Sequence, residues 1–337
     1  MLIFSKFFMT RIVFVTIIFL VSALYAGAQK TGAVDGNKWH DTNGNPINAH
    51  GAGVLFYNGT YYLFGEIKKG HTWRVPKQSW EDYRVPAGGV SCYSSKDLKN
   101  WKYEGVALSP VKGDPSNDLD TGRVIERPKV IHNSNTKKFV MWMHVDKKDY
   151  SYSQAGVAIS DNPTGPYHYL GSVKPNGQMA RDMTLFKDVD GKAYLIYSSE
   201  QNNTMQVCLL SNDYLKPRKT FTRILVNRRR EAPAVFKSGS KYYLITSSCT
   251  GWSPNAATYA VADKVLGPWK EYRNPCTGPG AGTTFESQST YVLPIRGEPG
   301  KFLFMADIWN KNDLEKSTYL WLPLSVQNGR VEIKKGK

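Results

Sequence analysis

A hairpin pattern that recurs five times constrains the fold of this 337-residue chain more than any other feature. Each copy consists of an apolar strand, a polar turn and an aromatic strand, and the first copy occupies residues 54–64. The other four copies occupy residues 130–143, 185–197, 235–246 and 292–305. A repeat at intervals of about fifty residues is typical of propellers, solenoids and similar arrays.

A second pair of strands follows the hairpin in each repeat, most clearly in residues 90–103, 156–167 and 259–269. Four strands per unit are typical of a propeller blade, and abundant Tyr, Trp, Phe and Gly suit many short strands joined by turns. The sequence therefore predicts an all-β chain folded as a five-bladed β-propeller. A β-sandwich is the competing fold, but it does not require five matching hairpins.

The first 28 residues have the pattern of a signal peptide. Lys6 and Arg11 make a positive start, residues 12–24 are almost wholly apolar, and Ala26-Gly27-Ala28 offers a cleavage site. The apolar run is short for a membrane span. We expect an exported protein (periplasmic, cell-surface or secreted) without a membrane span after cleavage, and one propeller domain in residues 29–337. An uncleaved anchor is the alternative.

The formal net charge of +16 makes acidic glycans or anionic surfaces candidate partners. Nucleic acid is not expected, because the charge is dispersed and no DNA-binding motif accompanies it. The run of Arg228, Arg229 and Arg230 is interpreted as a solvated loop. Four scattered cysteines match no zinc spacing, and we expect free thiols rather than disulfides.

One polar residue per repeat lies where the channel of a propeller opens. The first strand of each blade lines the channel. Counting back three or four positions from each first strand identifies His50, Glu126, Asp182, Glu231 and Gln288. Core-facing positions are usually apolar, so packing does not explain five polar residues at one level. We expect these side chains to meet around a single axial pocket.

Clustered carboxyl groups suit glycoside hydrolysis. One carboxyl must be protonated near neutral pH to donate to the leaving oxygen, and a second carboxylate nearby raises its pKa. A divalent metal site is the rival use of such a cluster. The aromatic turns favour a sugar ligand over a metal, so we expect no metal and no cofactor in the site. An axial calcium ion stays an open alternative.

Several motifs resemble glycoside hydrolase family 43 across essentially all of residues 29–337. They are Arg181-Asp182-Met183-Thr184-Leu185-Phe186 and Arg230-Glu231-Ala232-Pro233. A narrower resemblance, to the exo-β-1,3-galactanase group, rests on Ala49-His50-Gly51, Phe64-Gly65-Glu66, Glu126-Arg127-Pro128-Lys129-Val130, Thr250-Gly251-Trp252 and Ser287-Gln288-Ser289-Thr290. The resemblance implies an inverting, exo-acting hydrolase that releases galactose from β-1,3-galactan, the backbone of arabinogalactan.

By the same resemblance, Glu231 is the general acid, Asp182 raises its pKa and orients it, and Glu126 binds sugar hydroxyls. The family's usual blade-one Asp is missing, and His50 stands in that region. The resemblance implies Gln288 as the general base, acting through its imidic tautomer. His50 is the alternative base, because its intrinsic pKa suits proton transfer, although we favour it as a sugar ligand or structural group.

Further sugar contacts are expected from five residues of the surrounding loops, which are Glu66, Tyr152, Asn202, Thr250 and Trp252. Trp252 would stack on a sugar face. Arg230 should point away from Glu231, because a cation there would lower the pKa of the acid. Two other functions stay open, an α-L-arabinofuranosidase or β-xylosidase and a non-catalytic glycan-binding propeller.

Overall fold

Five sheets follow one another along the part of the chain that this computed structural model describes, which is residues 34–76 and 83–335. Contacts divide the chain into residues 1–30 and 31–337, and the sheets belong to the second unit. The predicted signal peptide lies outside the described residues. The description below therefore concerns the second unit by itself.

Each of the first four sheets has four strands in consecutive antiparallel order. Blade 1 consists of β2 (His50–Tyr57), β3 (Thr60–Lys68), β6 (Ala87–Ser95) and β7 (Lys102–Leu108). Blade 2 consists of β8 (Val124–His132), β9 (Phe139–Asp146), β10 (Gln154–Ser160) and β11 (His168–Val173). Blade 3 consists of β12 (Met183–Lys187), β13 (Ala193–Ser199), β14 (Thr204–Leu210) and β15 (Pro217–Ile224). Blade 4 consists of β16 (Arg230–Ser238), β17 (Lys241–Ser248), β18 (Thr258–Ala262) and β19 (Trp269–Tyr272).

The fifth sheet is larger and includes the first described residues. Its strands are β21 (Gln288–Pro294), β22 (Lys301–Ile308), β23 (Thr318–Gln327), β24 (Arg330–Lys334), β20 (Cys276–Thr277) and β1 (Val34–Asp35). Between β3 and β6 of blade 1, β4 (Trp73–Arg74) and β5 (Tyr83–Arg84) pair as a separate two-stranded sheet. Three short 3-10 helices connect strands within the described ranges, and they are Pro175–Gly177, Ala281–Thr283 and Leu314–Lys316.

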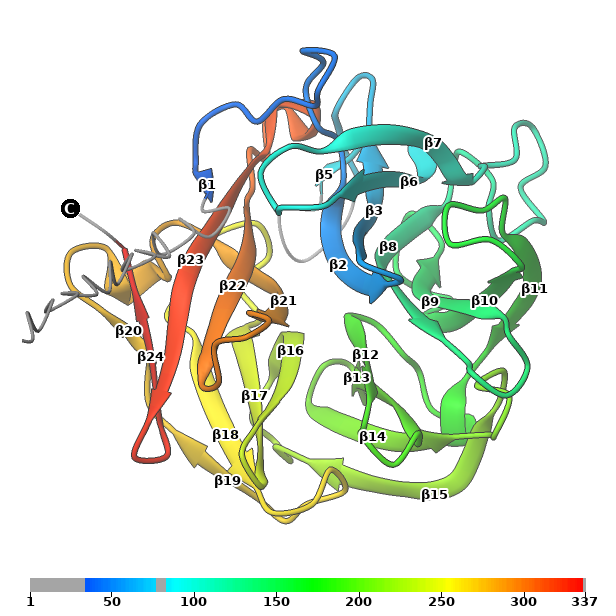
Figure 1. Cartoon of the computed structure of the whole chain (residues 1–337). Helices are drawn as coiled ribbons and strands as arrows, with labels where there is room; N and C mark the ends of the chain where they lie inside the picture. The colour runs from blue at the N-terminus through cyan, green and yellow to red at the C-terminus, as the bar shows by residue number, and fades with distance from the viewer. Residues whose placement is uncertain (1–33, 77–82, 336–337) are drawn as a thin grey trace, which may run out of the picture. The chain divides into compact units, whose positions relative to one another are not determined.

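The sheets form a closed ring, which confirms the predicted five-bladed propeller and excludes the sandwich. Figure 1 shows β2, β8, β12, β16 and β21 innermost around a common centre. Each of these first strands contacts the first strands of both neighbouring blades, and β21 contacts β2. The strand β1 pairs with the start of β23, so the segment before blade 1 completes an edge of blade 5.

Five apolar clusters alternate with the five blades and hold the ring together. Along β13, Ala193, Leu195 and Tyr197 pack against blade 2, whereas Tyr194 and Ile196 pack against blade 4. This alternation follows from the two-residue period of a strand, because successive side chains point to opposite faces. A strand buried on both faces needs a continuous apolar run. The apolar hairpin strands of the repeat have this character.

The described residues include no helix long and apolar enough to cross a membrane. All four cysteines are unpaired, in agreement with the expectation of free thiols. Cys92, Cys208 and Cys276 are buried in the blades, and Cys249 is half-buried.

Candidate active site

β-Bulges at the start of the first strands position the polar residues of the channel mouth. The register shifts after His50, after Glu126 and after Glu231, and also within β21 just after Gln288. The residue after each of the first three, which is Gly51, Arg127 or Ala232, has a positive φ of 54–56°. A bulge bends the strand and re-aims the side chain beside it. The bulges explain how strands running down the channel present polar side chains at its mouth.

A pocket of about 540 Å³ opens at this mouth. Eight of the residues singled out in the sequence line it, which are Glu66, Glu126, Asp182, Asn202, Glu231, Thr250, Trp252 and Gln288. They come from all five blades, so residues that are far apart in the chain share one cavity.

His50 and Tyr152, which the sequence also placed in the sugar site, do not line this pocket. The His50 ring is buried, stacks on Tyr319, and has Nδ1 3.2 Å from a carboxylate oxygen of Asp307. The Tyr152 ring packs against the apolar cluster between blades 1 and 2. Tyr150 takes the place expected for Tyr152, and its hydroxyl donates to both oxygens of Glu126 at 2.9 and 2.8 Å.

Glu231 is held by two amides and has a carboxyl that resists ionisation. Nε2 of Gln288 lies 3.0 Å from its Oε1, and Nδ2 of Asn202 lies 3.3 Å from its Oε2. Burial and the nearby charge of Asp182 raise the pKa of Glu231 to about 8, against the lowering effect of Arg127. A carboxyl with this pKa remains protonated at neutral pH and can donate a proton.

Arg127 connects the groups around Glu231. Its Nη2 lies 3.0 Å from Oδ2 of Asp182 and 2.6 Å from Oε1 of Gln288. Asp182 also accepts from the backbone N–H of Ala232 at 3.0 Å, directly after the acid. Nε1 of Trp309 donates to Oε1 of Gln288 at 3.0 Å. The side chain of Gln288 is therefore fixed with its oxygen toward donors and its nitrogen toward Glu231.

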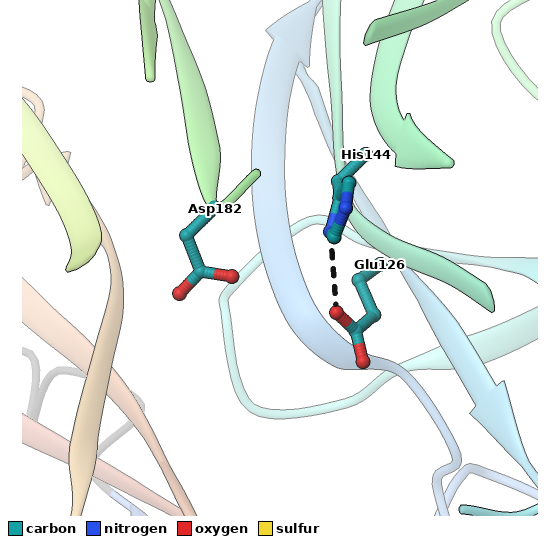
Figure 2. Close-up of side chains that lie close together, drawn as sticks. All are labelled: Glu126, His144 and Asp182. Atoms are coloured by element: carbon teal, nitrogen blue, oxygen red, sulfur yellow. Dashed lines mark ion pairs between the residues drawn. The ribbon is translucent and has the colours of Figure 1, made fainter. Parts of the chain in front are cut away.

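Glu126, His144 and Asp182 bring potential metal ligand atoms within 4.8 Å of one another. Figure 2 shows His144 beside Glu126, with Asp182 apart from both. Nδ1 of His144 lies 3.3 Å from Glu126, and its Nε2 lies 2.9 Å from Asp146. Burial opposes the charged ring, yet the two carboxylates outweigh it and raise the pKa of His144 to about 9. A protonated ring offers no lone pair, so a metal ion would have to displace the proton of His144 before it could bind there.

Glu126 and Glu66 face a shared cation. Nζ of Lys68 lies 2.9 Å from Glu66 and 3.7 Å from Glu126. Burial alone would raise the pKa of Glu126, but His144 and the charges of Lys68 and Arg84 lower it overall. Burial raises the pKa of Glu66 to about 7, despite Lys68. The pocket thus contains an ionised carboxylate, Glu126, as well as a carboxyl with a pKa above neutrality, Glu231.

Two indole rings also line the pocket. Trp252 and Trp309 meet edge to face with centroids 5.2 Å apart, and both line the pocket. Nζ of Lys68 lies 5.9 and 5.7 Å from the two ring centroids. Indole rings of this kind can stack on the apolar face of a sugar.

Lys129, on β8 of blade 2, is buried next to β2 and does not line the pocket. Its side chain is 1% exposed and fills space that Gly53 leaves free, because a Cβ at Gly53 would lie 2.5 Å from its Cδ. Its Nζ donates to the backbone oxygen of Gly51 at 2.7 Å.

The structure places several lining residues that the sequence interpretation did not select, including Arg127, Tyr150, Arg181, Gln201, Arg229, Cys249 and Trp309. One signal could have identified some of them. The second strand of each hairpin runs back to the same mouth, so His50 pairs with Glu66 and Glu126 with His144. Cys249 and Trp309 come directly after second strands, and they also lie at this mouth.

The arginine run divides in three directions, so the solvated-loop interpretation holds only in part. Arg228 forms an outward ion pair with Glu271 at 2.7 Å, whereas Arg229 lines the pocket. Arg230 donates to Thr246 and Ser248 within blade 4. It points away from the contacts of Glu231, as predicted.

Comparison with known proteins adds to this geometry. The model of glycosyl hydrolases family 43 matches residues 45–284. A solved family 43 β-1,3-galactosidase with galactodeoxynojirimycin is 41% identical, with a TM-score of 0.82 over 90% of this chain and 98% of that one. An exo-β-1,3-galactanase from Phanerochaete chrysosporium with β-1,3-galactotriose is 35% identical, with a TM-score of 0.80 over 89% and 66%.

An exo-β-1,3-galactanase from Clostridium thermocellum is 36% identical, with a TM-score of 0.77 over 89% of this chain and 64% of that one. The chain therefore spans nearly all of the first solved structure and about two thirds of the other two. A search of curated proteins found no match.

Proposed function

Because this chain belongs to glycosyl hydrolases family 43 and is a glycoside hydrolase, we propose that it is an inverting, exo-acting enzyme that releases galactose from β-1,3-galactan. The single observation that carries the proposal is Glu231, a carboxyl with a pKa of about 8 that lines a pocket of about 540 Å³ together with Asp182 and Gln288. The similar structures named above act on β-1,3-linked galactose, and they do not favour the alternatives of an arabinofuranosidase, a xylosidase or a non-catalytic binder.

In the proposed reaction Glu231 donates its proton to the glycosidic oxygen as the bond to the anomeric carbon breaks. A water molecule attacks the opposite face of that carbon and loses a proton to the base. Asp182 keeps Glu231 protonated through its charge, and the contact with Ala232 fixes Asp182 beside the acid. The product is galactose with inverted, α configuration.

We propose Gln288 as the group that activates this water, since His50 does not line the pocket. In the free protein the nitrogen of Gln288 donates to Glu231 and Ser247, and its oxygen accepts from Arg127 and Trp309. These partners stabilise the ordinary amide, whose nitrogen has no available lone pair. Base action therefore requires that substrate opens the contact with Glu231 and that the imidic tautomer forms.

For the terminal sugar we propose contacts from the ionised Glu126, from Glu66 and from the amide of Asn202. Trp252 would stack on the sugar face, and Thr250 lies in the same wall, where its hydroxyl donates to Ser253 O at 2.6 Å. Tyr150 joins this set in place of Tyr152. We also propose that the protein is exported, on the pattern of residues 1–28.

Product analysis tests this proposal. The purified protein should release galactose from β-1,3-galactotriose and from de-branched arabinogalactan, and early NMR spectra should show the α-anomer. The variant Glu231→Gln should release none on the same time scale. A β-anomer as first product, or activity confined to chromogenic arabinosides or xylosides, would refute the proposal.

A further inference from the structure

Two arginines line the pocket without a carboxylate partner among the described residues. These are Arg181 and Arg229. The other pocket cation, Arg127, is paired with Asp182 at 3.0 Å. The pocket carboxyls are also engaged, since Glu126 faces His144 and Glu66 faces Lys68. Among the residues that the structure describes, no carboxylate therefore compensates these two positive charges at the mouth.

The Arg181 guanidinium is held in place by uncharged groups. It donates to the hydroxyl of Ser153, the carbonyl of Tyr150 and the side-chain oxygen of Gln201, each at 3.2 Å. It also lies 5.4 Å from the ring centroid of Tyr150. These contacts orient the cation without neutralising it, and no hydrogen bond within the described ranges uses its Nη1. Such a group is prepared for an anion, because less side-chain freedom is lost on binding.

Arg229 stands on the same side of the pocket. Its side chain is exposed, and its backbone N–H donates to the carbonyl of Asn203 at 3.4 Å. Arg181 contacts Gln201 in that same loop. The two arginines therefore flank the loop of residues 200–203, one in front of blade 3 and one in front of blade 4.

This loop also locates the arginines relative to the chemistry. Asn202, within the loop, contacts Oε2 of Glu231. A general acid protonates the oxygen of the leaving group, so the leaving sugar lies next to Glu231. Glu66 and Trp309 line the pocket from blades 1 and 5. The arginines thus border the part of the pocket through which the remaining glycan departs.

We propose that Arg181 and Arg229 form an anion subsite on the leaving-group side, which binds a negatively charged substituent of the glycan next to the released galactose. A uronic acid carboxylate or a sulfate ester carries the required charge and paired oxygens, and guanidinium groups bind such oxygens in bidentate fashion. The inference rests on the proposed function. It makes an acidic, substituted galactan the preferred substrate.

Paired substrates test the subsite. Three β-1,3-galacto-oligosaccharides would be compared, in which the residue after the terminal galactose is unsubstituted, carries a uronic acid or carries a sulfate ester. We expect kcat/KM to be about tenfold higher for a charged substrate than for the neutral one, as hydrogen bonds to charged groups imply. Added salt should reduce this ratio, because the arginines are partly exposed to solvent.

The variants Arg229→Gln and Arg181→Gln should each lower the charged-to-neutral ratio. Arg228→Gln is the matched control, since Arg228 pairs with Glu271 outside the pocket, and it should keep the ratio of the unaltered protein. Whichever charged substrate, the uronic acid or the sulfate ester, is hydrolysed faster than the neutral one identifies the anion that the subsite binds. Equal rates on all three substrates, or a ratio that survives both arginine variants, would overturn the subsite. Hydrolysis of the neutral substrate reports separately on the proposed function.

Discussion

The amide nitrogen of Gln288 lies 3.0 Å from Oε1 of Glu231, so the proposed base and the proposed acid touch in the free protein. An inverting enzyme needs about 6.5–9.5 Å between its two catalytic groups, with the sugar and a water between them. The terminal sugar must therefore separate these two side chains when it binds. The contact gives Gln288 two separable roles, holding Glu231 before binding and activating water afterwards.

Substitution of Gln288 by Gly distinguishes these roles. If Gln288 activates water, its loss should reduce kcat by about 10²–10⁴-fold, the range expected for a general base. Azide, which needs no deprotonation, should then restore turnover and yield α-galactosyl azide, detectable by NMR. Gln288→Gly with Glu231→Gln is the control and should not respond to azide. If azide does not rescue the single variant Gln288→Gly, Gln288 does not activate water and only holds Glu231 in position.

The pH profile should report the protonation of Glu231. Its protonated form is the active one, so kcat/KM should fall as pH rises through about 8. Asp182→Asn removes a charge that raises this pKa, and it leaves the charge of Arg127 unopposed. The alkaline limb of the variant should therefore shift to lower pH. The shift should come with a lower rate, because the Asp182 contacts also orient the acid. A limb that stays in place would show that another group controls it.

Stability should depend on pH through His144. The pKa of this ring is about 9 in the folded protein and 6.5 ordinarily, so the folded state binds the proton more tightly. The resulting stabilisation is complete below pH 6.5 and is lost as pH rises to 9. Its full size is about 3 kcal/mol, from 1.36 kcal/mol per pKa unit.

Urea unfolding across this pH range checks the prediction. The variant His144→Gln should be less stable than the unaltered protein at pH 6 and should lose less stability toward pH 9. The carboxyls of Glu66 and Glu231 also have raised pKa values and titrate partly in this window. The relevant quantity is therefore the difference between variant and parent at each pH. An identical slope in both proteins would contradict the role given to His144.

The five-bladed ring was predictable because the fivefold hairpin repeat in the sequence is sufficient to indicate it. Strands buried on both faces need unbroken apolar runs, and the turns between them fix the register of each hairpin. The same register identified Glu126, Asp182, Glu231 and Gln288, because each stands just before or at the start of a first strand. For these residues, position within the repeat was sufficient to predict that they line the pocket.

The direction of individual side chains was less predictable. His50 occupies the equivalent place in blade 1, but Asp307 accepts from the backbone N–H of Gly51 and draws the ring into the blade interface. The directions of loop side chains depend on contacts that leave no recognisable pattern in the sequence. Asp146 accepts from the N–H groups of Tyr152 and Ser153, and the resulting turn presents Tyr150 to the pocket.

Substitution of Gly65 tests how strongly the stability of blade 1 depends on a close approach between two backbone segments. A Cβ at this position would lie 2.2–2.5 Å from backbone atoms of Ala49, the residue before His50. Backbone cannot give way as a flexible side chain does, so β3 and the segment entering β2 would have to separate. Gly65→Ala should cost more than about 3 kcal/mol, in the range of severe overpacking. Gly282→Ala is the control, since nothing lies within 4 Å of its Cβ position. Thermal unfolding of both variants provides the measurement, and equal melting temperatures would show that this close approach does not constrain the fold.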